Sequence, residues 1–99
     1  MKIIYNRFIP FKGFTAMAVF GRIYARKEFN PLSERTVRHE KIHAAQAKDM
    51  GGWIWFYIAY FLYWIEYGYR NSPFEKEAYG NDFKSDYLMK REKFAWKKY

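Results

Sequence analysis

Residues 33–52, SERTVRHEKIHAAQAKDMGG, carry the signals that begin and end a helix. Ser33 belongs to the residue types that cap helix N-termini, and Glu34 suits the first turn, where the helix dipole favours an acid. The pair Gly51-Gly52 stops a helix because glycine readily adopts conformations that do not continue it. The stretch therefore predicts a helix over about residues 33–50.

Strand signals come before this helix. Residues 2–11, KIIYNRFIPF, and residues 13–29, GFTAMAVFGRIYARKEF, are rich in β-branched and aromatic side chains, and Pro10 and Gly13 separate the two runs. We expect these runs to pair as a β-ribbon.

Helix signals continue after it. Trp53–Ile65 is a run of 13 uncharged residues, which is shorter than the roughly 20 that a membrane-spanning helix needs. We expect a helix that is buried in the core or lies at a membrane surface, with a full span as the less favoured alternative. Residues 74–99 follow as a last helix, in which apolar side chains from Phe74 to Phe94 recur at helical spacing. The prediction is a single α+β domain over residues 1–99, with an N-terminal β-ribbon followed by three helices.

The composition limits the chemistry and the partners. No cysteine occurs among the 99 residues, which excludes disulfides, thiolate metal sites and a cysteine nucleophile. The net charge of +8 favours anionic partners, and the aromatic share of 24% suits a membrane–water interface. An anionic membrane surface is therefore the expected partner, and nucleic acid is a less favoured one. Asn6 and Arg7 interrupt the apolar start before signal-peptide length, so the expected location is cytoplasmic, with the chain free, peripheral on the membrane or inserted in it.

The motif that carries chemistry is HEKIH, residues 39–43. His39 and His43 are four residues apart, so a helix places both imidazoles on one face, where they can bind one cation. Glu40 lies about 100° round the helix, close enough to take a proton from a metal-bound water. This HExxH pattern predicts a zinc site with two histidine ligands and Glu40 as the catalytic base. The alternative is a polar helix with two solvated histidines.

A catalytic zinc needs a third protein ligand, which must be a carboxylate because the chain has no further histidine. The last helix opens with two candidates, Glu75 and Glu77. Ala78 and Asp82 lie on the same side as Glu75, where the alanine leaves room for a metal and the aspartate is able to orient a histidine ring. Glu75 is therefore the preferred third ligand, and Glu77 is the alternative.

Two further polar residues are candidates for supporting roles. Gln46 follows His43 by three residues and shares its face, so it is a candidate hydrogen-bond partner for a ligand or substrate. Glu66 ends the aromatic run. If that run is buried, Glu66 needs a partner and becomes a candidate neighbour of the metal or an alternative ligand.

The segment EKEA, residues 75–78, resembles the ExxA motif of several gluzincin metallopeptidases. These include membrane-bound prenyl-protein peptidases and peptidases that cleave phage repressors, and they have Asp or Asn where this chain has Tyr79. The resemblance implies a zincin-like fold with Zn²⁺ as the cofactor. Over nearly its whole length the chain also resembles a group of short uncharacterised bacterial proteins with the same order of parts, from IPFKGFTAM (9–17) to YLMKREKFAWKKY (87–99).

Two function classes follow. The first is a zinc-dependent peptidase in which Glu40 activates the water and an edge strand of the ribbon binds an extended peptide or protein substrate. The second is a non-enzymatic, basic, aromatic-rich module that binds a membrane surface or nucleic acid, with any metal playing a structural part.

Overall fold

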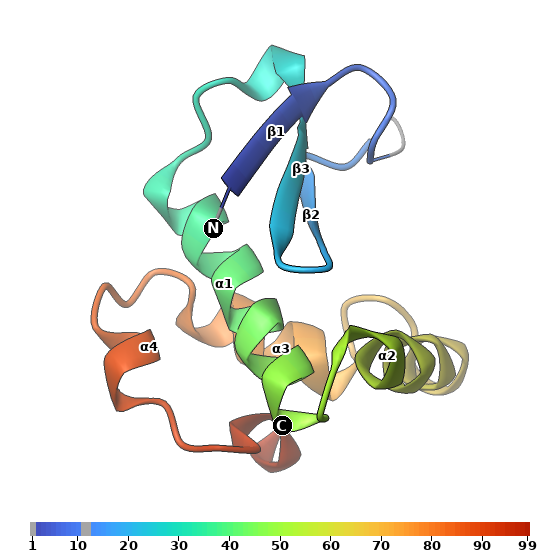
Figure 1. Ribbon diagram of the computed structural model, residues 1–99. Helices are drawn as coiled ribbons and strands as arrows, with labels where there is room; N and C mark the ends of the chain where they lie inside the picture. Colours follow the sequence, from blue (N-terminus) through green and yellow to red (C-terminus); the bar gives the residue numbers. More distant parts are fainter. Residues whose placement is uncertain (1, 11–12) are drawn as a thin grey trace.

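The protein is described by a computed structural model that covers residues 2–10 and 13–99 (Figure 1). In chain order its elements are β1 Lys2–Asn6, β2 Ala16–Val19, β3 Arg22–Arg26, η1 Lys27–Phe29, α1 Glu34–Asp49, α2 Trp53–Tyr67, α3 Pro73–Asn81, α4 Tyr87–Lys90 and η2 Ala95–Lys98. The fold class is α+β, as predicted, with the sheet at the N-terminal end of the chain and three main helices after it. Residue 11, the end of the first predicted strand, lies outside the described residues.

The sheet has three strands in the order β1-β3-β2 and is mixed. β2 and β3 form an antiparallel hairpin, while β1 pairs in parallel with the other edge of β3. Phe20 and Gly21 connect the hairpin with φ angles of 47° and 84°, which is the backbone of a tight two-residue turn that matches the strand twist. The predicted ribbon is thus present as the β2–β3 hairpin. β1 extends it to a sheet and leaves β2 as an edge strand.

Helix α1 begins and ends where its sequence signals predict. The Ser33 hydroxyl accepts a hydrogen bond from the backbone N–H of Thr36 at 3.1 Å, which caps the first turn. Gly51 follows the helix with a φ of 86°, a conformation that glycine adopts without strain. In Figure 1, α1 runs from the sheet through the middle of the molecule, α3 passes behind it, and α2 and α4 lie on opposite sides.

The core lies between the helices and is mainly aromatic. Phe74 is fully buried, and its ring centroid lies 4.9 Å from the ring centroids of both Phe56 and Trp96. Helix α2 contributes one face to this core and exposes the other. The exposed large apolar side chains of α2 are Ile54, Trp55, Ile58, Phe61, Leu62, Trp64, Ile65 and Tyr67. Within residues 2–10 and 13–99, no helix has the length and apolar character needed to cross a membrane.

The last helix is shorter than predicted, because α3 ends at Asn81 and two short helices follow. The side chain of Asn81 bonds the backbone carbonyl of Glu77 at 2.8 Å, and the backbone carbonyl of Asp82 accepts from Arg38 at 2.6 Å. Asparagine and aspartate compete with the helix for backbone groups, and here tertiary partners stabilise the break. The chain then turns back, so that Arg91 reaches the side chain of Glu77.

A buried ion-pair network holds this returning segment. The guanidinium of Arg91 bonds Glu77 and also bonds Asp49 at the end of α1, and all three side chains are at most 6% exposed. Removing one partner of a buried pair leaves a charge without compensation. We expect Arg91→Met to lower the free energy of unfolding by about 3–5 kcal/mol, as measured by chemical denaturation.

The control for this substitution is Lys90→Met, which removes the neighbouring cation. Lys90 pairs with Asp86 at 2.8 Å, but both side chains are exposed, so the pair is screened by water. Little change is expected. Equal unfolding midpoints for the two variants would contradict a stabilising role for the buried network.

Candidate metal centre

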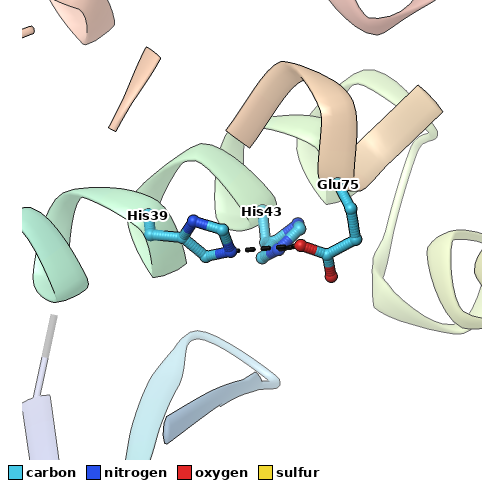
Figure 2. Close-up of side chains that lie close together, drawn as sticks. All are labelled: His39, His43 and Glu75. Carbon is cyan, nitrogen blue, oxygen red and sulfur yellow. Dashed lines mark hydrogen bonds and ion pairs between the residues drawn. The ribbon is translucent and has the colours of Figure 1, made fainter. Parts of the chain in front are cut away.

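His39 and His43 project from α1 toward Glu75 of α3, and Figure 2 shows the two rings and the carboxylate facing one another. Oxygen Oε1 of Glu75 lies 3.1 Å from Nε2 of His39 and 3.3 Å from Nε2 of His43. One ligand atom from each residue lies within 4.8 Å of the other two, and all three side chains are buried. The helical spacing of the histidines and the packing of α3 on α1 together bring three donor atoms to one point.

The donor atoms fit a zinc ion in type, and two of their three separations fit it in length. Zinc binds imidazole nitrogen and carboxylate oxygen at about 2.0–2.2 Å in tetrahedral geometry, which places neighbouring ligand atoms about 3.3 Å apart. The two nitrogen–oxygen separations of 3.1 and 3.3 Å match that value. Two histidines and one carboxylate also leave a fourth position free for water, as in catalytic zinc sites.

His39 is held from its other ring nitrogen by Asp82. Nδ1 lies 2.9 Å from Oδ2 of Asp82, and Arg35 holds the second oxygen of this carboxylate at 2.7 Å. Because a carboxylate only accepts, the proton is placed on Nδ1, which leaves Nε2 to face the shared point. The ring of Tyr79 packs edge-on against the His39 ring, with the centroids 4.5 Å apart.

His43 is held in the same way by Gln46. Nδ1 lies 2.8 Å from Oε1 of the Gln46 amide, and the amide nitrogen donates to the backbone carbonyl of Phe74 and to Glu77. These two acceptors determine which end of the amide is nitrogen, so Oε1 must accept from His43. Gln46 therefore places a proton on Nδ1 of His43 and directs Nε2 at Glu75.

In the absence of zinc, two residues of the triad, His43 and Glu75, form a charged pair. Burial alone lowers the pKa of His43, but the Glu75 carboxylate beside it raises the pKa to about 9. Burial raises the pKa of Glu75, but His43 and His39 lower it more, so its carboxyl has a pKa well below the ordinary value. The hydroxyl of Tyr60 donates to the outer oxygen of the same carboxylate. In the absence of zinc, the positive charge at this site is therefore carried by the protonated ring of His43.

We expect the His43 ring in the zinc-free protein to titrate at about pH 9, against the ordinary value of 6.5, and Glu75→Gln to bring this midpoint down toward 6.5. The measurement is histidine ring NMR over a pH series. Because the folded-state pKa is raised, the pair stabilises the zinc-free fold below pH 6.5 and loses this effect as the pH rises through 9. A midpoint near 6.5 in the unmodified protein would contradict the charged pair.

Glu40 lies beside the triad but outside it. Glu40 is 6% exposed and lines the same cavity wall as Ala18 of the edge strand β2. Burial raises the pKa of this carboxyl above its ordinary value, against the lowering effect of His43 and His39. A raised pKa makes the carboxylate a stronger base, which suits a group that accepts a proton from water.

Two members of the triad, His43 and Glu75, form part of the wall of a cavity of about 560 Å³ together with Glu40. The cavity lies between β2, the segment before it and helix α2. Its lining residues are Phe8, Ile9, Pro10, Phe14, Ala16, Met17, Ala18, Val19, Glu40, His43, Phe56, Tyr57, Tyr60, Trp64, Tyr69 and Glu75. A volume of roughly 300–1,000 Å³ is typical of sites that bind small molecules or side chains.

The other candidate residues lie in different environments. Glu77 bonds Gln46, Tyr87 and Arg91, so its carboxylate serves the buried ion-pair network. The expectation for Glu66 is wrong, because this part of α2 is exposed and Glu66 with it. Tyr60 was not singled out by the sequence, since ten tyrosines offer no signal to separate the one that contacts Glu75.

A comparison of the chain with protein-family models, with curated proteins and with solved structures finds no match. The resemblance of EKEA to a peptidase motif therefore carries no family assignment. The class of protein rests on the geometry alone. It is a small α+β protein with a candidate metal site of two histidines and one glutamate, buried between two helices.

Proposed function

We propose that this protein is a zinc-dependent peptidase whose metal is held by His39, His43 and Glu75. The observation that carries the proposal is the position of Glu40 at the wall of the same cavity as His43 and Glu75. A purely structural metal site has no use for a buried carboxylate that is free of the metal. A hydrolytic site needs one, because the attacking water must lose a proton.

Each residue then has a chemical task. A zinc ion held by these three residues would act as a Lewis acid and lower the pKa of a water molecule bound to it. Glu40 accepts the proton of the attacking water and passes it to the leaving amine. Asp82 and Gln46 keep the Nε2 lone pairs of the two histidines directed at the metal.

The edge strand β2 supplies a place for an extended peptide. The backbone N–H of Arg26 donates to the carbonyl of Thr15 at 3.1 Å, so Thr15 faces β3 and the next residue, Ala16, faces the open edge. The carbonyl of Ala18, which also faces this edge, is bonded by the hydroxyl of Tyr57 at 3.0 Å. A peptide would therefore pair at Ala16, or displace the Tyr57 hydroxyl to pair at Ala18.

The proposal is tested with zinc-loaded protein and an unfolded protein substrate. We expect cleavage that stops when a chelator removes the metal and returns when zinc is restored, with the new peptide ends identified by mass spectrometry. Cleavage that survives the removal of zinc would contradict the proposal, because another peptidase would then be the source.

A second candidate function rests on the outer face of α2, and we propose that this face binds an anionic membrane surface. Ile54, Ile58, Phe61, Leu62 and Ile65 lie along one side of the helix and are 47–68% exposed. Five large apolar side chains exposed along one side of a helix indicate an interaction surface. The helix is too short to span a bilayer, so it would lie in the interface plane.

Cations near α2 support an anionic partner. Lys48 lies beside Trp53 at the start of the helix. The ammonium of Lys97 lies 5.8 Å from the ring of Trp96, which packs on Tyr63 of α2. The helix itself contains one charged residue, Glu66, and the whole chain carries a net charge of +8. Apolar insertion and charge attraction would thus act together.

We expect the protein to co-sediment with vesicles that contain phosphatidylserine, and Leu62→Glu to weaken this binding by about tenfold or more, because a buried leucine side chain is worth roughly 1.5–3 kcal/mol. Met89→Glu is the control, since Met89 is also exposed but lies on α4. If both variants lost vesicle binding equally, the loss would come from the added negative charge and not from the apolar face of α2. A dimer formed through α2, with no vesicle binding, would contradict the membrane proposal.

A further inference from the structure

The cavity beside the candidate metal centre has a chemical character that restricts its occupant. Among the described residues that line it, the charged or basic groups are Glu40, His43 and Glu75, and all three belong to the site. The remaining walls are aliphatic and aromatic. The cavity therefore offers no separate ion with which a charged side chain of a substrate could pair.

Two of the three tyrosines in the wall have hydroxyl groups that are already engaged. The Tyr57 hydroxyl donates to the carbonyl of Ala18 at 3.0 Å, and the Tyr60 hydroxyl donates to Glu75. A polar side chain that entered the cavity would lose its bonds to water and find two of the three tyrosine hydroxyls already engaged, which is unfavourable.

An apolar side chain has no hydrogen bonds to water to lose, and its transfer from water into the cavity is favourable. The rings of Phe56, Tyr60 and Trp64 on α2 line the cavity, and so do Ala16 and Ala18 on β2. The alanines leave the width that a larger side chain needs. A volume of about 560 Å³ holds a phenylalanine or leucine side chain with room to spare.

The open edge of β2 distinguishes a peptide from a lipid as the occupant. The backbone of Ala16 faces this edge beside the cavity, and a peptide main chain can bond it, whereas an acyl chain cannot. We infer that the cavity binds a bulky apolar side chain of an extended peptide, next to the bond that faces the metal centre. The inference rests on the proposed peptidase function and names its substrate class as apolar peptide segments.

The test measures binding rather than cleavage. Zinc-loaded Glu40→Gln protein is titrated calorimetrically with an end-blocked hexapeptide that has Phe-Leu at its centre, and with the same peptide that has Ser-Asn there. We expect the Phe-Leu peptide to bind roughly ten- to a hundredfold more tightly, because its side chains leave water for an apolar wall. Ala16→Trp, which fills the cavity, should remove this preference while zinc stays bound.

The matched control is Ala44→Trp. Ala44 is also a half-buried alanine, but it lies in a separate hollow with Lys48 and Trp53, so the preference should remain. If the two peptides bound equally to the Glu40→Gln protein, the inference would be overturned, and the Ala16→Trp variant would not be needed to decide it. The inference would also be overturned if lauric acid bound in the cavity and neither peptide did. A preference for Phe-Leu supports the inference even if the unmodified protein cleaves neither peptide, and that failure would count against the peptidase proposal alone.

Discussion

In the zinc-loaded protein, Glu40→Gln should lower the rate of peptide hydrolysis by about 10²–10⁴-fold while zinc affinity and the fold stay unchanged. Glutamine keeps the size of the side chain and can still hydrogen-bond the attacking water, but it cannot take the proton. Glu40 is buried and lines the same cavity wall as Ala18 of β2, and no other described carboxylate of this wall is free of the metal to replace it. The measurement is the turnover rate at saturating zinc, with the zinc content determined on the same sample.

Glu34→Gln is the matched control, because Glu34 lies on the same helix but is exposed in its first turn. The control should retain full activity. If Glu40→Gln retained it too, the metal site would be structural and the peptidase proposal would fail.

Replacing His43 with alanine should lower zinc affinity by more than about a hundredfold, because even the loss of a group that only orients a ligand costs roughly 10–100-fold. His39→Ala and Glu75→Gln should act alike, since each removes one of three ligands. Affinity is measured by competition with a chelator, and circular dichroism reports whether the variant is folded.

The sharper comparison is between Glu75→Gln and Glu77→Gln. The two glutamates are two residues apart on α3 and both are buried, but Glu75 faces the histidines while Glu77 bonds Arg91. The first variant should lose zinc affinity, together with the stabilising effect of the Glu75 pair with His43. The second should lose stability and keep most of its zinc affinity when folded. If Glu77→Gln lost more zinc affinity than Glu75→Gln, Glu77 would be the third ligand instead.

Local signals explain why some parts of this structure could be predicted from sequence. Helix α1 lies within one residue of its expected bounds because the Ser33 hydroxyl caps its first turn and Gly51 adopts a backbone conformation that does not continue the helix. The two histidines meet because a helix has a fixed period. The hairpin and the class of fold follow from residue types that favour strands and turns.

Long-range contacts explain what the sequence could not predict. The choice between Glu75 and Glu77 depends on Arg91, which is distant in the chain and pairs with only one of them. The end of α3 depends on Asp82, whose backbone and side chain bind Arg38 and Arg35 of α1. Such partners appear only when the chain is folded, so periodicity alone extended the last helix too far.

We propose that one zinc ion is held by Nε2 of His39, Nε2 of His43 and Oε1 of Glu75. X-ray absorption at the zinc edge, on the protein loaded with one equivalent of zinc, tests this coordination. We expect a four-coordinate ion with two imidazole nitrogens and lighter oxygen donors at about 2.0–2.2 Å, and the loss of one imidazole in His43→Ala. A six-coordinate spectrum of hydrated zinc without imidazole, unchanged by His43→Ala, would contradict it.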